Sequence, residues 1–322
     1  MQLWGRACSL SEVCLPVEGP QVFKRFSRAC AALAVAAGIV AVPATAQAQD
    51  HCPAVVVVAA RGSGQNNQVY PTWYSNQARS ASNGWEGETI RAMLHTVEAR
   101  YRATHGGASV MKDVHVLGLT PDFYPATFPD YYVPNVERPS TLQQVFGIVS
   151  TWAGPVINMA TSAANQFTYS VQTGRKGVRN AIDHYEATSG CRPQYILTGF
   201  SQGAMVLAEH EKELAKRGQL AGVVYLGNPM TARNDPFTVG NTTGIGGPLG
   251  WTGNSTVGSR ATNNRINYCL PLDGVCDMSS ETLQAARVNA GGSHGRYFLW
   301  WSQWDNQVAD AVGQWVDQVR YR

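Results

Sequence analysis

The segment from Tyr195 to Leu207 carries the residue pattern with the most specific chemistry in the chain. An apolar run ends at Leu197, Gly-Phe-Ser-Gln-Gly occupies 199–203, and a helix-forming segment follows. Gly-x-Ser-x-Gly between a strand and a helix is a nucleophile elbow, a strained turn that exposes a serine hydroxyl. Glycine is required at both ends of the motif because a Cβ atom there would collide with the neighbouring backbone. The pattern therefore predicts that Ser201 is a nucleophile.

A serine hydroxyl at neutral pH needs a histidine base, and the histidine needs a carboxylate that fixes its tautomer. Enzymes with this elbow present the three residues in the order Ser, Asp, His. Two histidines follow Ser201, namely His210 and His294. His210 lies nine residues further along the predicted elbow helix, about 13 Å away at 1.5 Å per residue, which is too far. We therefore predict that His294, on a glycine-rich turn, is the base.

Asp273 is the predicted carboxylate partner of the histidine. It follows a predicted strand and lies between Cys269 and Cys276, and a short disulfide there would hold the carboxylate rigidly. Asp277 is the competing carboxylate. The non-catalytic alternative is that Asp273 is an ordinary turn aspartate before glycine.

Two backbone amides are candidates for an oxyanion hole. The amide of Gln202 lies at the start of the elbow helix, where it can point at a developing negative charge. The β-branched run from Ala54 to Ala60 predicts a strand buried on both faces. It ends in Arg-Gly-Ser-Gly, and sheets of this kind bind ligands at the carboxyl ends of their strands. We therefore expect Ser63 to contribute its amide, the alternative being a solvated turn.

The remaining elements are predicted from hydrophobic periodicity. Apolar runs predict three further strands, at Val114–Leu119, Gly222–Leu226 and Arg265–Cys269. Helical spacing predicts helices at Glu86–Tyr101, Gly174–Ala187, Met205–Arg217, Ser280–Ala290 and from Tyr297 onward, the last with a buried stripe that includes Trp301. The sequence thus predicts an α/β fold.

Two insertions interrupt this pattern. Residues 127–169 contain an apolar stripe from Leu142 to Met159, which Pro155 is expected to kink or break. The stripe predicts either packing on the core or a lid for a long acyl chain. Residues 231–264 are rich in Gly, Thr and Asn and predict a long irregular loop, of the kind that is usually functional or mobile.

Composition restricts the class of protein. The chain has 322 residues, of which 44% are apolar and 15% charged, and this suits one large α/β domain or two small ones. The formal net charge of +3 is too small to indicate nucleic-acid binding.

The first 48 residues resemble an export signal. Lys24, Arg25 and Arg28 precede a short apolar segment from Ala29 to Pro43, and Ala-Gln-Ala at 46–48 is a cleavage site. The apolar segment is too short to span a bilayer comfortably. We expect a signal peptide at 1–48, a hydrolase domain at 49–322, and a secreted or cell-envelope protein with no membrane span after cleavage. The alternatives are an uncleaved anchor and a translation start downstream of Met1.

Four of the seven cysteines lie after the leader. An even number in an exported protein indicates disulfides, and four cysteines allow three pairings. Cys52 and Cys191 each precede a predicted strand, and the starts of parallel strands lie on one edge of a sheet. Cys52–Cys191 is therefore the reasonable pair, which leaves Cys269–Cys276 as a short local loop. A zinc site is the alternative, but no Cys-x-x-Cys spacing supports it.

In combination, these motifs resemble the cutinase family. The matching features are Cys-Pro at 52–53 before a valine-rich strand that ends in Ala-Arg-Gly-Ser, Tyr-Pro-Ala at 124–126, Cys191 before the elbow, Gly-Phe-Ser-Gln-Gly-Ala, and the Asp-x-Val-Cys of 273–276. Phe200 stands where the family frequently has tyrosine. Gly-Asn-Pro-Met at 227–230 and the long insertions are also similar to phage lysin B and to actinobacterial envelope mycolate esterases.

The resemblance implies a cutinase-like α/β-hydrolase fold, a three-layer sandwich around a mainly parallel five-stranded sheet. It implies a serine esterase without metal or cofactor. Transferred by position, it assigns the triad to Ser201, Asp273 and His294, and the oxyanion hole to Ser63 and Gln202. Its disulfides correspond to Cys52–Cys191 and Cys269–Cys276.

We expect a monomeric, secreted carboxylic-ester hydrolase that acts on lipid esters of long acyl chain, including mycolate glycolipids of the cell envelope. One alternative is an acyl transferase, in which a sugar hydroxyl instead of water intercepts the acyl-enzyme. The other is a non-catalytic envelope-binding protein on a hydrolase scaffold. No nucleic-acid partner is expected.

Overall fold

The computed structural model describes residues 52–127, 142–240, 243–252, 261–288 and 292–322, without the side chains of 142–161, 163 and 286–288. Contacts divide the chain into Met1–Gln47 and Ala48–Arg322, and all described residues belong to the second unit. The expected signal peptide therefore lies outside the described residues. No helix in the described ranges is both long and apolar enough to cross a membrane.

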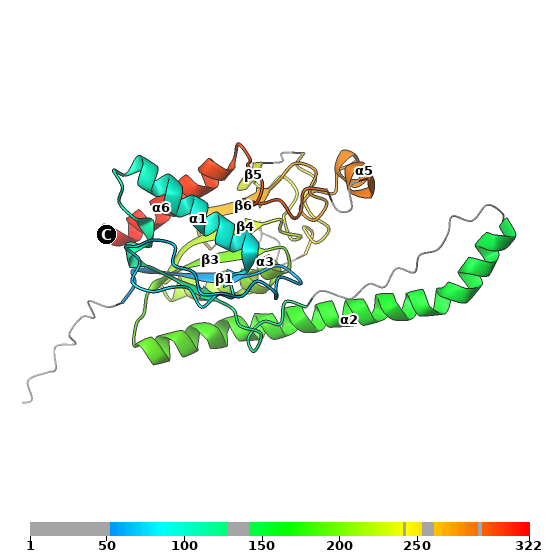
Figure 1. The fold of residues 1–322 in the computed structure, drawn as a ribbon, viewed down its shortest axis with the longest axis horizontal. Coiled ribbons are helices and arrows are strands. Elements are labelled where there is room, and N and C mark those ends of the chain that lie inside the picture. Colours follow the sequence, from blue (N-terminus) through cyan, green and yellow to red (C-terminus); the bar gives the residue numbers. More distant parts are fainter. Residues whose placement is uncertain (1–51, 128–141, 241–242, 253–260, 289–291) are drawn as a thin grey trace, which may run out of the picture. The chain divides into compact units, whose positions relative to one another are not determined.

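The centre of the molecule is a parallel sheet of six strands in the order β2-β1-β3-β4-β6-β5 (Figure 1). The strands are β1 (Val55–Ala60), β2 (Val114–Gly118), β3 (Gln194–Phe200), β4 (Leu220–Leu226), β5 (Thr238–Gly240) and β6 (Arg265–Cys269). Every residue of β1 and β6 is buried, as are all residues of β3 and β4 after their first. Such burial explains the continuous apolar runs in the sequence.

Helices cover both faces of the sheet, which confirms the three-layer α/β architecture. The helices are α1 (Gly87–Thr104), α2 (Leu142–Ser189), α3 (Gln202–Leu207), α4 (Glu211–Lys216), α5 (Ser280–Val288) and α6 (Asp305–Arg320). Residues 55, 57 and 59 of β1 belong to a core cluster with α1 and α6. Residues 56, 58 and 60 belong to the opposite cluster, with α2 and α3. Figure 1 shows α1 and α6 on one side of the sheet and α2 on the other.

Two sequence-based expectations about the elements are wrong. The sheet has six strands instead of five, because β5 lies in the segment expected to be an irregular loop and pairs with β6. A three-residue edge strand is too short to show periodicity. The expected helix Met205–Arg217 is three pieces, with a 3-10 turn at Ala208–His210 between α3 and α4. Helix α2 runs from Leu142 to Ser189 as one element, so Pro155 does not break it. Figure 1 shows that the first part of this helix bends away from the rest.

The last helix begins at Asp305 and not near Tyr297. Tyr297 is fully buried in the core, and Phe298 adopts a φ of 58°, which a helix does not allow. As a result Trp301, expected in the buried stripe, is 85% exposed, whereas Trp315 within α6 is buried.

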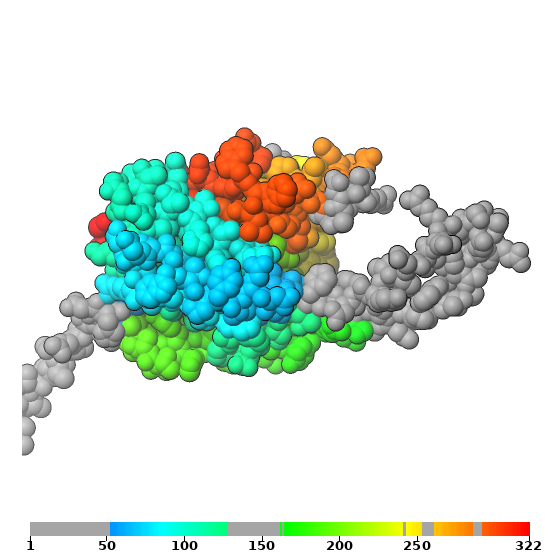
Figure 2. Space-filling view, viewed as in Figure 1, coloured from blue at the N-terminus to red at the C-terminus, as the bar shows by residue number. Residues whose placement is uncertain are grey.

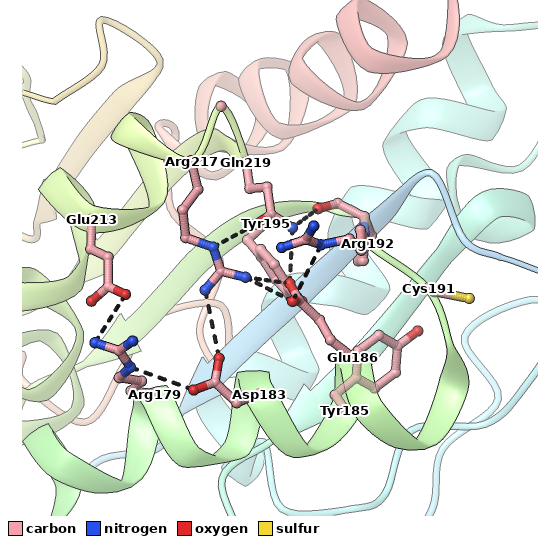
Figure 3. A network of polar contacts seen from close by, with 12 residues as sticks. Arg179, Asp183, Tyr185, Glu186, Cys191, Arg192, Tyr195, Glu213, Arg217 and Gln219 are labelled. Carbon is pink, nitrogen blue, oxygen red and sulfur yellow. Dashed lines mark hydrogen bonds and ion pairs between the residues drawn. The ribbon is translucent and has the colours of Figure 1, made fainter.

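The amino-terminal edge of the sheet is held by a disulfide and a polar network. Cys52 and Cys191 are bonded, with Cα atoms 5.6 Å apart. Next to this bridge, Glu186 near the end of α2 accepts hydrogen bonds from the Tyr195 hydroxyl at 2.9 Å and from the Arg217 guanidinium at 2.7 Å (Figure 3). Gln219 donates to the same carboxylate at 2.9 Å. This edge is opposite to the one at which the elbow lies.

Candidate active site

Ser201 lies in the turn that joins β3 to α3, at the carboxyl edge of the sheet. Its backbone has a φ of 54° and a ψ of −117°, a conformation that non-glycine residues rarely adopt. The backbone N–H of Ser201 donates to the carbonyl of Leu226 at the end of β4, at 2.9 Å. The strained turn is therefore tied to the neighbouring strand, and the serine remains partly exposed.

The two glycines of the elbow allow close backbone contacts. A Cβ atom on Gly199 would lie 2.6 Å from the backbone nitrogen of Ala204. A Cβ atom on Gly203 would overlap the carbonyl oxygen of Ala60. Helix α3 therefore starts directly against the ends of β3 and β1, for the steric reason that the sequence pattern indicates.

His294 and Asp273 are in direct contact. The imidazole Nδ1 lies 2.9 Å from Oδ2 and 3.0 Å from Oδ1 of the carboxylate. Asp273 is completely buried and also accepts a hydrogen bond from the backbone N–H of Val275 at 2.8 Å. When Nδ1–H donates to the carboxylate, Nε2 is the nitrogen that can accept a proton.

Tyr297 is a further partner of the carboxylate that the sequence did not reveal. Its hydroxyl donates to Asp273 Oδ2 and accepts from the backbone N–H of Leu270 at 3.0 Å. Burial, and then the negative charge of Asp273, raise the pKa of the Tyr297 phenol, so it remains a donor. The sequence placed Tyr297 at the start of a helix, and no local signal indicated its inward orientation.

The imidazole packs against the residue that precedes the candidate nucleophile. The rings of His294 and Phe200 are stacked, with centroids 4.9 Å apart and an interplanar angle of 26°. Among the described residues, the hydrogen bonds of the His294 ring join its Nδ1 to Asp273, and none joins the ring to the Ser201 hydroxyl. In free enzymes such hydrogen bonds are often long and shorten when substrate binds.

The other candidates from the sequence are engaged elsewhere. Nε2 of His210 lies 2.6 Å from the carbonyl oxygen of Arg175 on α2. The carboxylate of Asp277 accepts hydrogen bonds from the hydroxyls of Thr243 and Thr282, both at 2.6 Å. Asp273 is the carboxylate that contacts His294. Its loop is closed by the disulfide Cys269–Cys276, with Cα atoms 5.8 Å apart.

Ser63 and His294 line the same cavity. This cavity of about 700 Å³ is bordered by residues 63–68, by Phe200 and by residues 294–295. Figure 2 shows the blue segment that contains Ser63 next to the orange-red segment that contains His294. A Cβ atom on Gly62 would lie 2.5 Å from the Phe200 ring, so the Ser63 loop packs directly on the elbow. Gln202 starts α3 and is 1% exposed, so its side chain points inward.

Within the described part of the chain, no group of three or more His, Cys, Asp or Glu side chains is arranged to bind a metal ion. A strained serine turn, a buried Asp–His pair and an adjoining cavity at the carboxyl edge of a parallel sheet are the features expected of an α/β-hydrolase site.

A sequence model of the family described as Cutinase matches residues 126–299, more than half of the chain. The chain therefore belongs to the cutinase family and is a carboxylic-ester hydrolase. No curated protein matches the sequence.

Several solved structures resemble the chain at low identity. An acetylxylan esterase solved at 0.90 Å has 15% identity and a TM-score of 0.46, with 82% of this chain and 99% of that chain covered. The catalytic core domain of acetyl xylan esterase from Trichoderma reesei has 16% identity and a TM-score of 0.42, covering 82% and 98%. Trichoderma reesei cutinase in complex with a phosphonate inhibitor has 17% identity and a TM-score of 0.38, covering 82% and 77%.

Gly227 provides a test of how tightly the site is built. It has a φ of +54°, and a Cβ atom there would lie 2.7 Å from His294 Cε1 and 2.9 Å from Asp273 Oδ2. We expect Gly227→Ala to displace the imidazole and to lower kcat about 100-fold, since an error of 1 Å in position can cost that much. The measurement is kcat on a soluble p-nitrophenyl ester.

Gly218→Ala is the matched control for this substitution. Gly218 has a φ of +67°, and nothing lies within 4 Å of its hypothetical Cβ atom. The Gly218→Ala substitution therefore introduces similar backbone strain, about 1–2 kcal/mol, but the added methyl group does not contact the site. Equal losses of kcat in the two variants would show that strain alone, and not displacement of His294, lowers activity.

Proposed function

We propose that the protein is a secreted serine esterase in which Ser201 is the nucleophile, His294 the base and Asp273 the carboxylate. The backbone N–H groups of Ser63 and Gln202 form the oxyanion hole. The observation that carries the proposal is the contact of the His294 imidazole with buried Asp273 on one side and with Phe200, next to the elbow serine, on the other.

The proposed reaction has two halves. Ser201 Oγ bonds to the ester carbonyl carbon while His294 Nε2 takes the hydroxyl proton, and the carbonyl π pair becomes an oxyanion held by the two N–H groups. The intermediate then expels the alcohol, which receives the proton from His294. In the second half water attacks the acyl-enzyme, gives its proton to His294, and releases the acid and the free serine.

We propose a lipid ester of long acyl chain as the substrate class, with mycolate glycolipids of the envelope as members to be tested. The apolar stripe from Leu142 to Met159 that suggested this class lies outside the described side chains. The proposed substrate class is supported by exposed apolar residues that lie close in sequence to Asp273 and His294. Leu272 precedes Asp273 and is 36% exposed, and Leu299, Trp300 and Trp301 follow His294 and are 44%, 66% and 85% exposed.

Export is supported by two observations. Cys52–Cys191 and Cys269–Cys276 are disulfides, which persist in oxidising compartments. The predicted signal sequence at 1–48 is consistent with them. We propose one hydrolase domain over 49–322, with 127–169 and 231–264 as insertions.

The proposed function is tested by covalent labelling. A fluorophosphonate probe phosphonylates a nucleophilic serine, whose oxygen displaces fluoride from phosphorus, so we expect labelling of the wild-type protein and none of Ser201→Ala. Retained labelling in that variant would assign the nucleophile elsewhere, and absence of labelling in both proteins would contradict the mechanism.

The substrate class requires a second assay. We expect kcat/KM to rise with acyl length across a series of esters, and free fatty acid to be the product from extracted envelope glycolipids. Equal rates on butyrate and long-chain esters would contradict the lipid assignment. Transfer of the acyl group to an added sugar such as trehalose would identify a transferase instead.

A further inference from the structure

Tyr124, in the Tyr-Pro-Ala motif after β2, connects the two segments that carry the proposed oxyanion-hole residues. Its side chain is completely buried. The phenol oxygen lies 2.9 Å from Oε1 of Gln202 and 3.1 Å from the carbonyl oxygen of Arg61. Its single proton is thus shared between the elbow helix and the loop that leads to Ser63.

Ser170 on α2 holds the same amide oxygen from another direction. It is completely buried, and its hydroxyl donates to Gln202 Oε1 at 2.8 Å. The Ser170 oxygen also accepts a hydrogen bond from the backbone N–H of Thr127 at 3.1 Å. Two hydroxyls, from segments far apart in the sequence, therefore fix the Gln202 side chain.

The side-chain amide of Gln202 is only partly hydrogen-bonded in this position. Its Nε2 is buried and has no hydrogen-bond partner among the residues that the structure describes. A buried donor without a partner is unfavourable for folding. A functional constraint on the position of Gln202 explains why this cost is tolerated.

The Ser63 loop is attached to the Tyr124 segment by further hydrogen bonds. The backbone N–H of Gly64 donates to the carbonyl of Ala126 at 2.8 Å, and Asn66 Nδ2 donates to the carbonyl of Pro125 at 3.1 Å. The guanidinium of buried Arg61 donates to the carbonyl oxygens of Leu119 and Tyr124. Residues 124–126 therefore act as a common support for both oxyanion-hole segments.

We infer that Tyr124 and Ser170 are positioning residues that set the distance between the backbone N–H groups of Ser63 and Gln202. This inference rests on the proposed function, since it assumes that these two groups bind the oxyanion. Donors held in place before the reaction stabilise the transition state without reorganisation. Loss of either hydroxyl loosens the donors but does not remove them.

The two hydroxyls have no alternative role in the chemistry. Burial raises the pKa of the Tyr124 phenol, so it remains protonated and cannot act as a base near neutral pH. Neither Tyr124 nor Ser170 borders the cavity beside His294. An effect of their removal on catalysis must therefore pass through the backbone groups they hold.

The test uses Tyr124→Phe and Ser170→Ala in the full-length protein. We expect each to lower kcat about tenfold, less than the loss of about 100-fold or more when an oxyanion donor is removed, with KM unchanged. The affinity for an alkyl trifluoromethyl ketone, whose adduct with Ser201 carries the oxyanion, should fall by the same factor as kcat/KM. The double variant should lose less than the product of the two factors, because both hydroxyls act on Gln202.

Tyr195→Phe is the matched control. Tyr195 is also completely buried and also donates its hydroxyl to a side-chain oxygen, that of Glu186. It lies beside Glu186 in the polar network of the amino edge (Figure 3). Tyr195 is near the start of β3, whereas Ser201 directly follows the end of that strand. Its kcat and ketone affinity should equal those of the wild type, although Tm falls as in Tyr124→Phe.

Two outcomes would overturn the inference. Unchanged kcat and ketone affinity in folded Tyr124→Phe and Ser170→Ala would show that neither hydroxyl positions the donors. Equal losses in the Tyr195→Phe control would assign the effect to general destabilisation. If the proposed function itself were wrong, the Ser201→Ala variant would retain activity or labelling. This result distinguishes failure of the proposed function from failure of the inference about Tyr124 and Ser170.

Discussion

His294→Ala is expected to lower kcat about 10⁵- to 10⁶-fold, a loss as large as that expected for removal of the Ser201 nucleophile. Without the imidazole, the enzyme lacks the base that is proposed to take the Ser201 proton and to return it to the leaving alcohol. The oxyanion hole and substrate binding should leave a rate above that of the uncatalysed reaction. The measurement is kcat on a p-nitrophenyl ester at substrate saturation, with folding checked by circular dichroism.

His210→Ala is the control for this prediction. His210 contacts the carbonyl of Arg175, and burial lowers the pKa of its imidazole. Its removal should cost about 0.5–1.5 kcal/mol of unfolding free energy through the lost hydrogen bond, with kcat unchanged. Comparable losses of kcat in the two variants would contradict the assignment of His294 as the base.

Asp273→Asn is expected to lower kcat about 10⁴-fold while the fold is retained. The carboxylate contacts the imidazole at Nδ1, and in the proposed mechanism it stabilises the imidazolium that forms when Ser201 loses its proton. An amide of the same shape carries no charge, and its NH2 group faces donors, including the Tyr297 hydroxyl. The measurement is kcat/KM relative to wild type across a range of pH.

Asp277→Asn is the matched control, because Asp277 is an equally buried aspartate in the same region that does not contact His294. We expect a loss of about 1–3 kcal/mol in unfolding free energy, from donors left without a good acceptor, and no loss in kcat. A larger fall in kcat for Asp277→Asn than for Asp273→Asn would exchange the two roles.

The candidate residues were predictable because each belongs to a local pattern. The elbow motif indicates Ser201 through the steric requirement for glycine. Distance along the elbow helix disfavoured His210 and left His294, and the position between two cysteines favoured Asp273 over Asp277. The structure brings Asp273 and His294 into contact, while their catalytic roles stay predictions. Tyr297, Tyr124 and Ser170 were not predicted as site residues, because their contacts depend on tertiary packing between segments distant in sequence.

The fold was predicted where burial is continuous. Five strands follow from apolar runs, and the α/β-hydrolase architecture is confirmed. Strand β5 was missed because its three residues gain their structure from pairing with β6. The start of α6 was placed too early because Trp301 continues the apolar spacing of the helix, although the backbone turns at Phe298.

The disulfide at the amino edge also affects how the chain can reach its fold. Strands β1 and β3 are neighbours in the sheet, yet Cys52 and Cys191 just before them are 139 residues apart in sequence. Pairing across such a distance is slow, and meanwhile the valine-rich β1 segment is exposed to self-association. Once the Cys52–Cys191 disulfide has formed, the path along covalent bonds between β1 and β3 is short, so the two segments are held close together before they pair. Efficient refolding therefore requires an oxidant as well as removal of denaturant.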